Sequence, residues 1–360
     1  MVLPPPSSRH VPALMDELLE EIFIRLLLDD PAILFRAALV CKSWCLLISG
    51  HSLRHRLLEF HGSPPLRGFF CRIGGEPASR FDEDLPELCG KHINLVLWNP
   101  GGGKVLRLPR PPMFTYQWNT ALLCTAPGCG HLDCGYGSGQ FQVVLAGIRP
   151  SNGLTFACVC SSEQRTWSKP VSAWLNGVQV KVGSNARAIA GNILCLLCDM
   201  AKKVLKYDMG KQELSLIRPP IPDDTVSDDW RRVALMRAEG GGLGFAMTQK
   251  FKLFMWSKEA AGLDNEDAGW VQRRVIDLYE MIPDAWFHWV PFSAPKVSAV
   301  AEHVGIIFVD MCAGLFSIDL KSGLVRKLLV SNYIIRDVVP YMSFCTPGIS
   351  LVSCSLAPIF

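Results

Sequence analysis

The sequence predicts an α+β multidomain protein in which a short helical module is followed by a long all-β region. Apolar residues recur at helical spacing in the first part of the chain, whereas from Leu66 onward short apolar or alternating runs are separated by Gly, Asn, Asp and Pro. The chain has 360 residues, which is enough for two domains with a sizeable core. We expect a disordered N-terminus, a helical domain, a linker and a β-domain over residues 1–11, 12–58, 59–65 and 66–360.

The predicted first helix carries an apolar residue at every fourth position, which places these residues on one face: Leu14, Leu18, Ile22 and Leu26. Acidic residues are expected on the other face, where they favour the N-terminal end of the helix through its dipole: Asp16, Glu17, Glu20 and Glu21. So few helical residues cannot bury their apolar surface alone. The pattern therefore predicts a module that docks on a partner.

Two further short helices are expected before the β-region. Asp30 followed by Pro31 is typical of an N-cap and a first helical residue. Spacings of three and four predict a third helix that contains Val40, Cys41, Trp44, Leu47 and Ile48. The basic stretch Arg54-His55-Arg56 is interpreted as the solvated end of this third-helix region.

These residues resemble an F-box, whose usual pattern runs Leu-Pro, two acidic residues, Leu-Leu, Glu-Ile, Arg-Leu-Pro and then Val-Cys-Lys-x-Trp. The string Val40-Cys41-Lys42-Ser43-Trp44 carries the most specific part of the match, while Met15 and Leu27 stand where the pattern usually has Pro. The resemblance implies a three-helix F-box that binds a Skp-family adaptor, which bridges to a cullin and its RING protein. The adaptor-binding residues that it implies are Leu14, Leu18, Ile22, Leu26, Pro31, Leu34, Val40, Cys41 and Trp44.

The β-region contains strand-turn-strand units of similar shape. Their turn markers are separated by 62, 47, 49 and 62 residues: Asn99, Ser161, Asp208, Ser257 and Asp319. A four-stranded propeller blade takes about 40 to 50 residues plus loops, so the spacing predicts a propeller-like domain of about five or six blades. We expect strands from both ends of this region to close the ring; a β-sandwich is the second possibility.

Two of these units also resemble the repeats of plant F-box-associated propeller domains. They are the segment around Trp98-Asn99-Pro100 and the segment around Tyr207-Asp208. The chain as a whole resembles the large F-box family of grasses.

Other motifs are weaker. One loop holds four residues of the types that bind zinc: Cys124, Cys129, His131 and Cys134. Their compressed spacing favours a loop without metal over a zinc site. Trp286 and Trp289 are either core residues between blades or anchors for a target. Cys195 and Cys198 are interpreted as core residues, and the run Gly240 to Gly244 as a bend between strands.

Composition excludes several classes of function. The formal net charge is only +3 and no dense Lys/Arg run occurs, so we expect neither nucleic acid nor membrane as a partner. Residues 1–12 lack the apolar run of a signal peptide, and most of the 14 Cys lie in apolar runs, which is typical of a reduced cytoplasmic or nuclear protein. The uncharged tail 338–360 holds three Pro, which favours strands and turns over a membrane anchor.

We therefore expect the substrate-recognition subunit of an SCF-type E3 ubiquitin ligase, with a β-domain that binds an unknown protein target. Such a subunit is not itself an enzyme, and no cofactor is expected. A non-ligase F-box scaffold and, less favoured, a propeller enzyme remain the alternatives.

Overall fold

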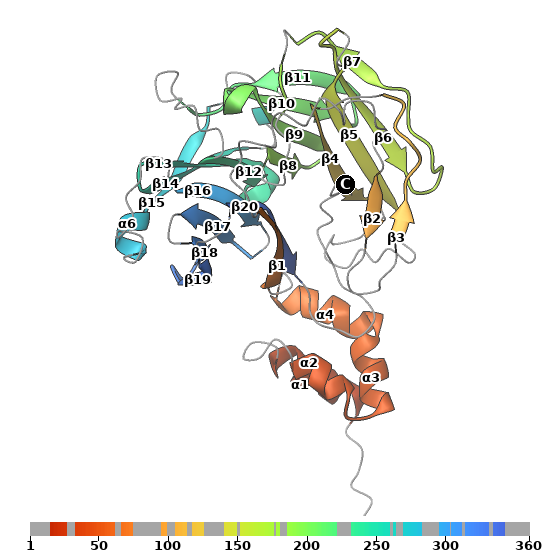
Figure 1. Ribbon diagram of the computed structural model, residues 1–360. Coiled ribbons are helices and arrows are strands. Elements are labelled where there is room, and N and C mark those ends of the chain that lie inside the picture. Colours follow the sequence, from red (N-terminus) through yellow and green to blue (C-terminus); the bar gives the residue numbers. More distant parts are fainter. Residues whose placement is uncertain are drawn as a thin grey trace, which may run out of the picture.

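The chain folds into a helical module and a β-domain, which lie side by side in Figure 1. The computed structural model describes these residues: 15–26, 33–61, 66–74, 95–98, 105–113, 117–125, 140–149, 152–175, 178–180, 186–221, 232–259, 262–263, 269–282, 295–302, 304–311, 314–330 and 334–342.

The helical module contains four helices rather than the three expected. They are α1 (Asp16–Leu26), α2 (Ile33–Ala38), α3 (Lys42–Ser49) and α4 (His51–His61). Gly50, with φ −65° and ψ 151°, ends α3, and the chain starts a new helix at once. Helix α4 therefore contains the stretch Arg54-His55-Arg56 and continues into the first residues of the predicted linker. None of the helices in the described segments is long and apolar enough to cross a bilayer.

A small core holds the four helices together. It is formed by Leu19, Phe23, Ile24, Leu34, Ala38, Ile48, Leu53 and Leu57. Leu53 and Leu57 are four residues apart and fully buried, so one face of α4 packs onto the other helices. These two leucines explain why α4 belongs to the module and is not a free end of α3.

The described part of the β-domain contains four antiparallel four-stranded sheets. The first consists of β4 (Gln117–Cys124), β5 (Phe141–Ile148), β6 (Thr155–Ser161) and β7 (Val171–Ala173). The second consists of β8 (Arg187–Ala190), β9 (Ile193–Cys198), β10 (Lys203–Asp208) and β11 (Glu213–Ile217). The third consists of β12 (Val233–Arg237), β13 (Leu243–Gln249), β14 (Lys252–Lys258) and β15 (Val271–Asp277), and the fourth of β16 (Lys296–Ala301), β17 (Ile306–Met311), β18 (Gly314–Asp319) and β19 (Val325–Val330).

The prediction of five or six blades is therefore wrong for the described residues, which form four. The turn markers Ser161, Asp208, Ser257 and Asp319 each lie at or next to the end of the third strand of a sheet. The unit around Asn99 forms only a two-stranded sheet of β2 (Val96–Trp98) and β3 (Val105–Arg107). A hairpin repeat in the sequence thus does not by itself report a complete four-stranded blade.

The sheets are arranged as blades around a common centre (Figure 1). The first strands of the blades are neighbours: β4 contacts β8, β8 contacts β12, and β12 contacts β16. Apolar clusters fill the space between successive blades, for example Val233, Leu235 and Phe245 of the third blade against Cys195 and Leu197 of the second. Face-to-face packing of this kind is the architecture of a β-propeller.

Strands from the two ends of the β-domain pair with each other, as expected, although they form a two-stranded sheet of their own and do not complete a four-stranded blade. Strand β1 (Leu66–Gly74) runs antiparallel to β20 (Ile334–Met342), with Leu66 opposite Met342 and Gly74 opposite Ile334. Strand β20 contacts β16, and its Val338 is buried against the fourth blade. The expected strand in the uncharged tail is present up to Met342; residues 343–360 lie outside the described residues.

Local side-chain chemistry fixes the turns. The Asp208 carboxylate accepts backbone N–H hydrogen bonds from Gly210 and Lys211 at 2.9 and 3.0 Å. Asp319 repeats this arrangement in the fourth blade, where it accepts from Lys321 and Ser322 at 2.8 and 3.1 Å. These bonds confirm the interpretation of both Asp residues as turn markers.

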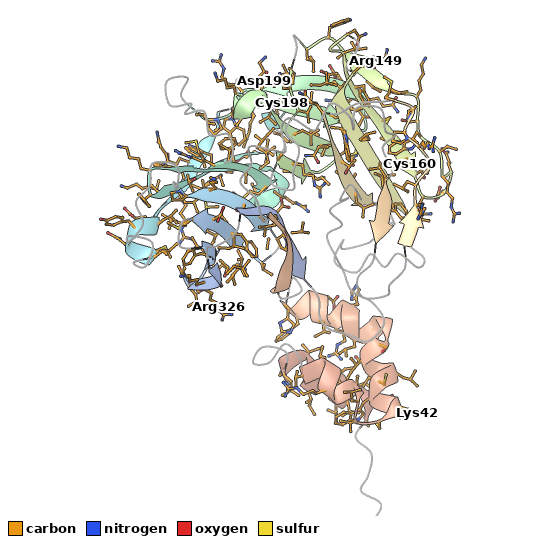
Figure 2. All side chains as sticks on the ribbon, in the orientation of Figure 1. Lys42, Arg149, Cys160, Cys198, Asp199 and Arg326 are labelled. Atoms are coloured by element: carbon orange, nitrogen blue, oxygen red, sulfur yellow. The ribbon has the colours of Figure 1, made fainter. Side chains whose placement is uncertain are left out.

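The described strand cysteines are core residues, as expected. Cys195 and Cys198 of β9 and Cys158 and Cys160 of β6 are at most 1% exposed, and Figure 2 labels Cys160 and Cys198 within their sheets. Burial raises the pKa of the Cys195 and Cys198 thiols to about 12, because the thiolate is disfavoured away from water. The run that starts at Gly240 is likewise the expected bend, since it forms a turn between β12 and β13 in which Gly240 has φ 78°.

Candidate docking surface on the helical module

Helix α1 has two different apolar faces. Its inner face is buried in the module through Leu19, Phe23 and Ile24. Its outer face carries a row of exposed apolar residues at spacings of three and four: Met15, Leu18, Ile22 and Leu26. Leu18 is 47% and Ile22 43% exposed, so the described members of the predicted four-residue repeat lie on the solvent side of the helix.

The α2–α3 segment adds three more exposed apolar residues to the helical module. Leu39 and Val40 connect the two helices and are 73% and 65% exposed, and Leu46 of α3 is 75% exposed. We call the seven residues the exposed apolar set: Met15, Leu18, Ile22, Leu26, Leu39, Val40 and Leu46. Eight of the fourteen exposed large hydrophobic residues in the described part of the chain lie in the helical module, if Phe60 is included. This concentration in a short segment marks a surface for a partner.

The remaining predicted adaptor-binding residues lie in different environments. Leu34 is fully buried and belongs to the module core. Trp44 is half-buried and packs edge-on against Phe23, with 5.2 Å between ring centroids. Cys41 is exposed and caps α3, where its sulfur accepts the backbone N–H of Trp44 at 3.5 Å. Leu14 and Pro31 lie outside the described residues.

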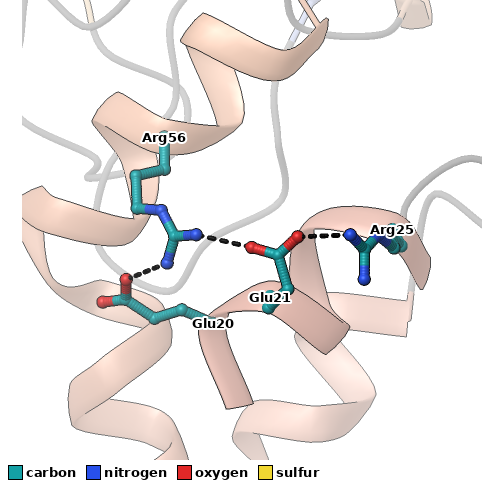
Figure 3. A network of polar contacts seen from close by, with 4 residues as sticks. All are labelled: Glu20, Glu21, Arg25 and Arg56. Atoms are coloured by element: carbon teal, nitrogen blue, oxygen red, sulfur yellow. Dashed lines mark hydrogen bonds and ion pairs between the residues drawn. The ribbon is translucent and has the colours of Figure 1, made fainter. Parts of the chain in front are cut away.

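A polar network joins α1 to α4 (Figure 3). The Arg56 guanidinium donates to Glu20 at 2.8 Å and to Glu21 at 2.6 Å, and Glu21 also pairs with Arg25 at 2.6 Å. The hydrogen bond to Glu20 is the main reason that the pKa of Arg56 is raised above its ordinary value. The Glu20 side chain is only 12% exposed and faces α4, on the side of α1 away from the exposed row.

The last residue of α4 also contacts α1. The His61 ring nitrogen Nε2 donates to the Ile24 carbonyl at 2.8 Å. In Figure 1, α4 lies between the other three helices and the β-domain. Lys42, at the start of α3, lies at the end of the module remote from the β-domain (Figure 2). The end of the module that holds Lys42 is therefore not covered by the described part of the β-domain.

The sequence did not single out several residues of this surface. Met15, Leu39 and Leu46 were missed as surface residues, and Arg56 was assigned to solvent. The sequence did contain a pattern that could have placed Arg56 on a packed helix. Leu53 and Leu57 lie on either side of it, and their four-residue spacing indicates a buried helix face.

Most of the weaker candidates lie outside the described residues. Cys124 ends β4, while Cys129, His131 and Cys134 lie outside the described residues, as do Trp286 and Trp289. Within the segments that the structure describes, no three His, Cys, Asp or Glu side chains gather as metal ligands.

The chain is a two-domain protein in which a helical module with an exposed apolar surface is joined to a β-propeller. Family comparison agrees for both domains. A model described as F-box-like matches residues 16–59, and a model described as "F-box protein AT5G49610-like, beta-propeller" matches residues 106–348. The second match covers more than half of the chain, which therefore belongs to the AT5G49610-like family of F-box propeller proteins.

Other comparisons are remote. No curated protein is a significant match to the sequence. Among solved structures, the dihydro-heme d1 dehydrogenase NirN is 11% identical with a TM-score of 0.34, and covers 78% of this chain and 55% of that one. A chain of the mitotic checkpoint complex is 11% identical with a TM-score of 0.33, covering 75% of each chain, and one of the S. cerevisiae core factor is 10% identical with a TM-score of 0.36, covering 81% and 46%. The chain thus spans about half of the first of these proteins, and none of the three informs on function.

Proposed function

We propose that this protein is the substrate-recognition subunit of an SCF-type E3 ubiquitin ligase. In this role the helical module docks on a Skp-family adaptor through the exposed apolar set, and the adaptor links it to a cullin and its RING protein. The observation that supports the proposal most directly is the outer row of α1, where Leu18, Ile22 and Leu26 stay exposed while the inner face is packed. Family membership supports it independently.

The size of the docking energy follows from the exposed fractions. Full burial of a large apolar side chain contributes about 1.5–3 kcal/mol. Because Leu18 and Ile22 are already half-buried, docking gains roughly half of that for each. Leu39, Val40 and Leu46 are more exposed and gain more. Buried Leu34 gains nothing directly and contributes by holding α2 in place.

The test is co-purification of the full chain with a Skp-family adaptor. Leu18→Asp puts a carboxylate into the proposed interface, and we expect adaptor affinity to fall at least ~10-fold. Leu324→Asp is the matched control, because Leu324 is 50% exposed but lies in the β-domain. Equal adaptor binding by wild type and Leu18→Asp would contradict the proposed docking surface. Trp44→Ala is less selective, since Trp44 also packs against Phe23.

The β-domain is proposed to bind the target protein, so that lysines of the target lie near the ubiquitin-charged enzyme. The chain itself then performs no chemistry and acts by raising effective concentration. Reconstitution with adaptor, cullin and RING protein tests the ligase role through ubiquitin transfer to a bound protein or to the chain itself. Adaptor binding without any transfer would instead favour the non-ligase scaffold. The proposed place of action is the cytoplasm, the nucleus or both.

A further inference from the structure

We propose that the ion-pair cluster of Arg56 couples the docking helix α1 to the strand pair that closes the propeller ring. The coupling runs through α4, which is fastened to α1 and leads directly into β1. This coupling requires both domains but does not depend on the proposed ligase role.

The first step is the attachment of α4 to α1. Arg56 contacts two carboxylates of α1, and one of these, Glu20, is nearly buried. Such charge-assisted, two-pronged contacts hold the direction of the helix more firmly than a single exposed pair does. His61 fastens the end of α4 through the Ile24 carbonyl, and Leu53 and Leu57 fill the space between. Helix α4 is therefore held on α1 up to its final residue.

The second step is the distance from α4 to the closing strand. Only residues 62–65, Gly-Ser-Pro-Pro, separate His61 from Leu66 at the start of β1. Five Cα-to-Cα steps span at most about 18 Å. The position of His61 thus restricts where β1 can begin, and the segment has little length with which to absorb a displacement of α4.

The third step is the weakness of the closure. β1 and β20 form a two-stranded sheet, and a two-stranded sheet is marginal unless other elements support it. The described support is on the β20 side, through β16 and the burial of Val338. Strand β1 comes from the other end of the chain, and a released α4 would raise the entropic cost of bringing it to β20. We therefore expect the closure to open more often when α4 is released.

Coupling of this kind is reciprocal. A partner that binds the outer face of α1 would stabilise the α1–α4 contact and protect the β1–β20 pair. This extension rests on the proposed docking function, whereas the coupling itself is measurable in the free chain.

Hydrogen exchange of the full-length chain, read by mass spectrometry, tests the inference. In Arg56→Gln we expect amides of β1 and β20 to exchange at least ~5-fold faster, with β9, β10 and β13 unchanged. Arg25→Gln is the matched control, because Arg25 also pairs with Glu21 but lies on α1 itself. We expect it to exchange like wild type. His61→Ala removes the second attachment of α4 without leaving a carboxylate unpaired. We expect it to speed exchange of β1 and β20 as well, so it replaces Arg56→Gln as the test if that variant does not fold.

Three outcomes would overturn the inference. The first is that β1 and β20 exchange at the wild-type rate in the folded variants, whether or not the amides of α4 exchange faster. The second is the same acceleration in Arg25→Gln. The third is equal acceleration of all sheets, because that would report global destabilisation and not opening of the closure. Adaptor binding is measured separately, so failure of the coupling and failure of the docking proposal are distinguishable.

Discussion

The indole nitrogen of Trp270 donates a hydrogen bond to the backbone carbonyl of Arg218 at 2.9 Å. Trp270 immediately precedes the outer strand of the third blade, and Arg218 immediately follows the outer strand of the second. Trp167 makes a similar bond to the Pro109 carbonyl at 2.8 Å; it lies in the segment between β6 and β7, and Pro109 lies two residues after β3. The same bond thus fastens one set of strands to the preceding set at two places around the ring.

Trp270→Phe should lower the stability of the β-domain by about 1 kcal/mol, because it removes the N–H donor and leaves the carbonyl without that partner. Urea unfolding followed by fluorescence measures the change. Trp174→Phe is the control, since Trp174 is 69% exposed and should change stability little. Equal stability of Trp270→Phe and wild type would show that this bond does not fasten the blades.

Asp310 of β17 should make stability depend on pH. Burial raises its pKa to about 6 from the ordinary 3.8, although Lys296 on the adjacent strand opposes the shift. The folded chain therefore binds this proton more tightly than the unfolded chain, and stability is lost as pH rises from about 4 through 6. The difference of roughly two between the folded and unfolded pKa values of Asp310 corresponds to a loss of at most about 3 kcal/mol in the free energy of unfolding. Asp310→Asn should remove this part of the pH dependence; urea unfolding of both proteins at pH 5 and pH 7.5 gives the comparison, and parallel pH profiles would contradict it.

Asp208→Ala should destabilise the second blade by about 1–2 kcal/mol, because two backbone N–H groups of the β10–β11 turn lose their acceptor. Asp208→Asn keeps an acceptor oxygen at the same position and should cost less. Thermal unfolding of the three proteins ranks them. If the Asn variant is as unstable as the Ala variant, the turn bonds are not the cause.

Thiol reactivity should separate the cysteines. Cys41 is exposed, whereas Cys195 and Cys198 are buried and have pKa values of about 12. Iodoacetamide at pH 8 should therefore modify Cys41 in the folded chain and reach Cys195 and Cys198 only after denaturation. Mass spectrometry of the peptides gives the readout. Rapid modification of Cys198 under native conditions would mean that β9 is not a core strand.

Much of the local structure could be predicted from the sequence. The outer row of α1 and the turns after Asp208 and Asp319 follow from periodicity and turn chemistry, which act over a few residues. The fourth helix was harder to predict, because the basic stretch Arg54-His55-Arg56 separates Leu53 from Leu57 and gives the segment the composition of an exposed loop or helix end. The partner of Arg56 was also beyond a local pattern, since Glu20 lies 36 residues away in the chain.

Helix and strand periods are properties of neighbouring residues, so local patterns were enough to predict a two-faced helical segment followed by a series of antiparallel hairpins. Three features could be seen only in the folded chain: the number of complete sheets, the pairing of Leu66 with Met342, and the inward position of Glu20 beside an exposed Leu18. These features depend on which distant surfaces exclude water together. That choice is made by the packing of the whole chain and not by any one segment.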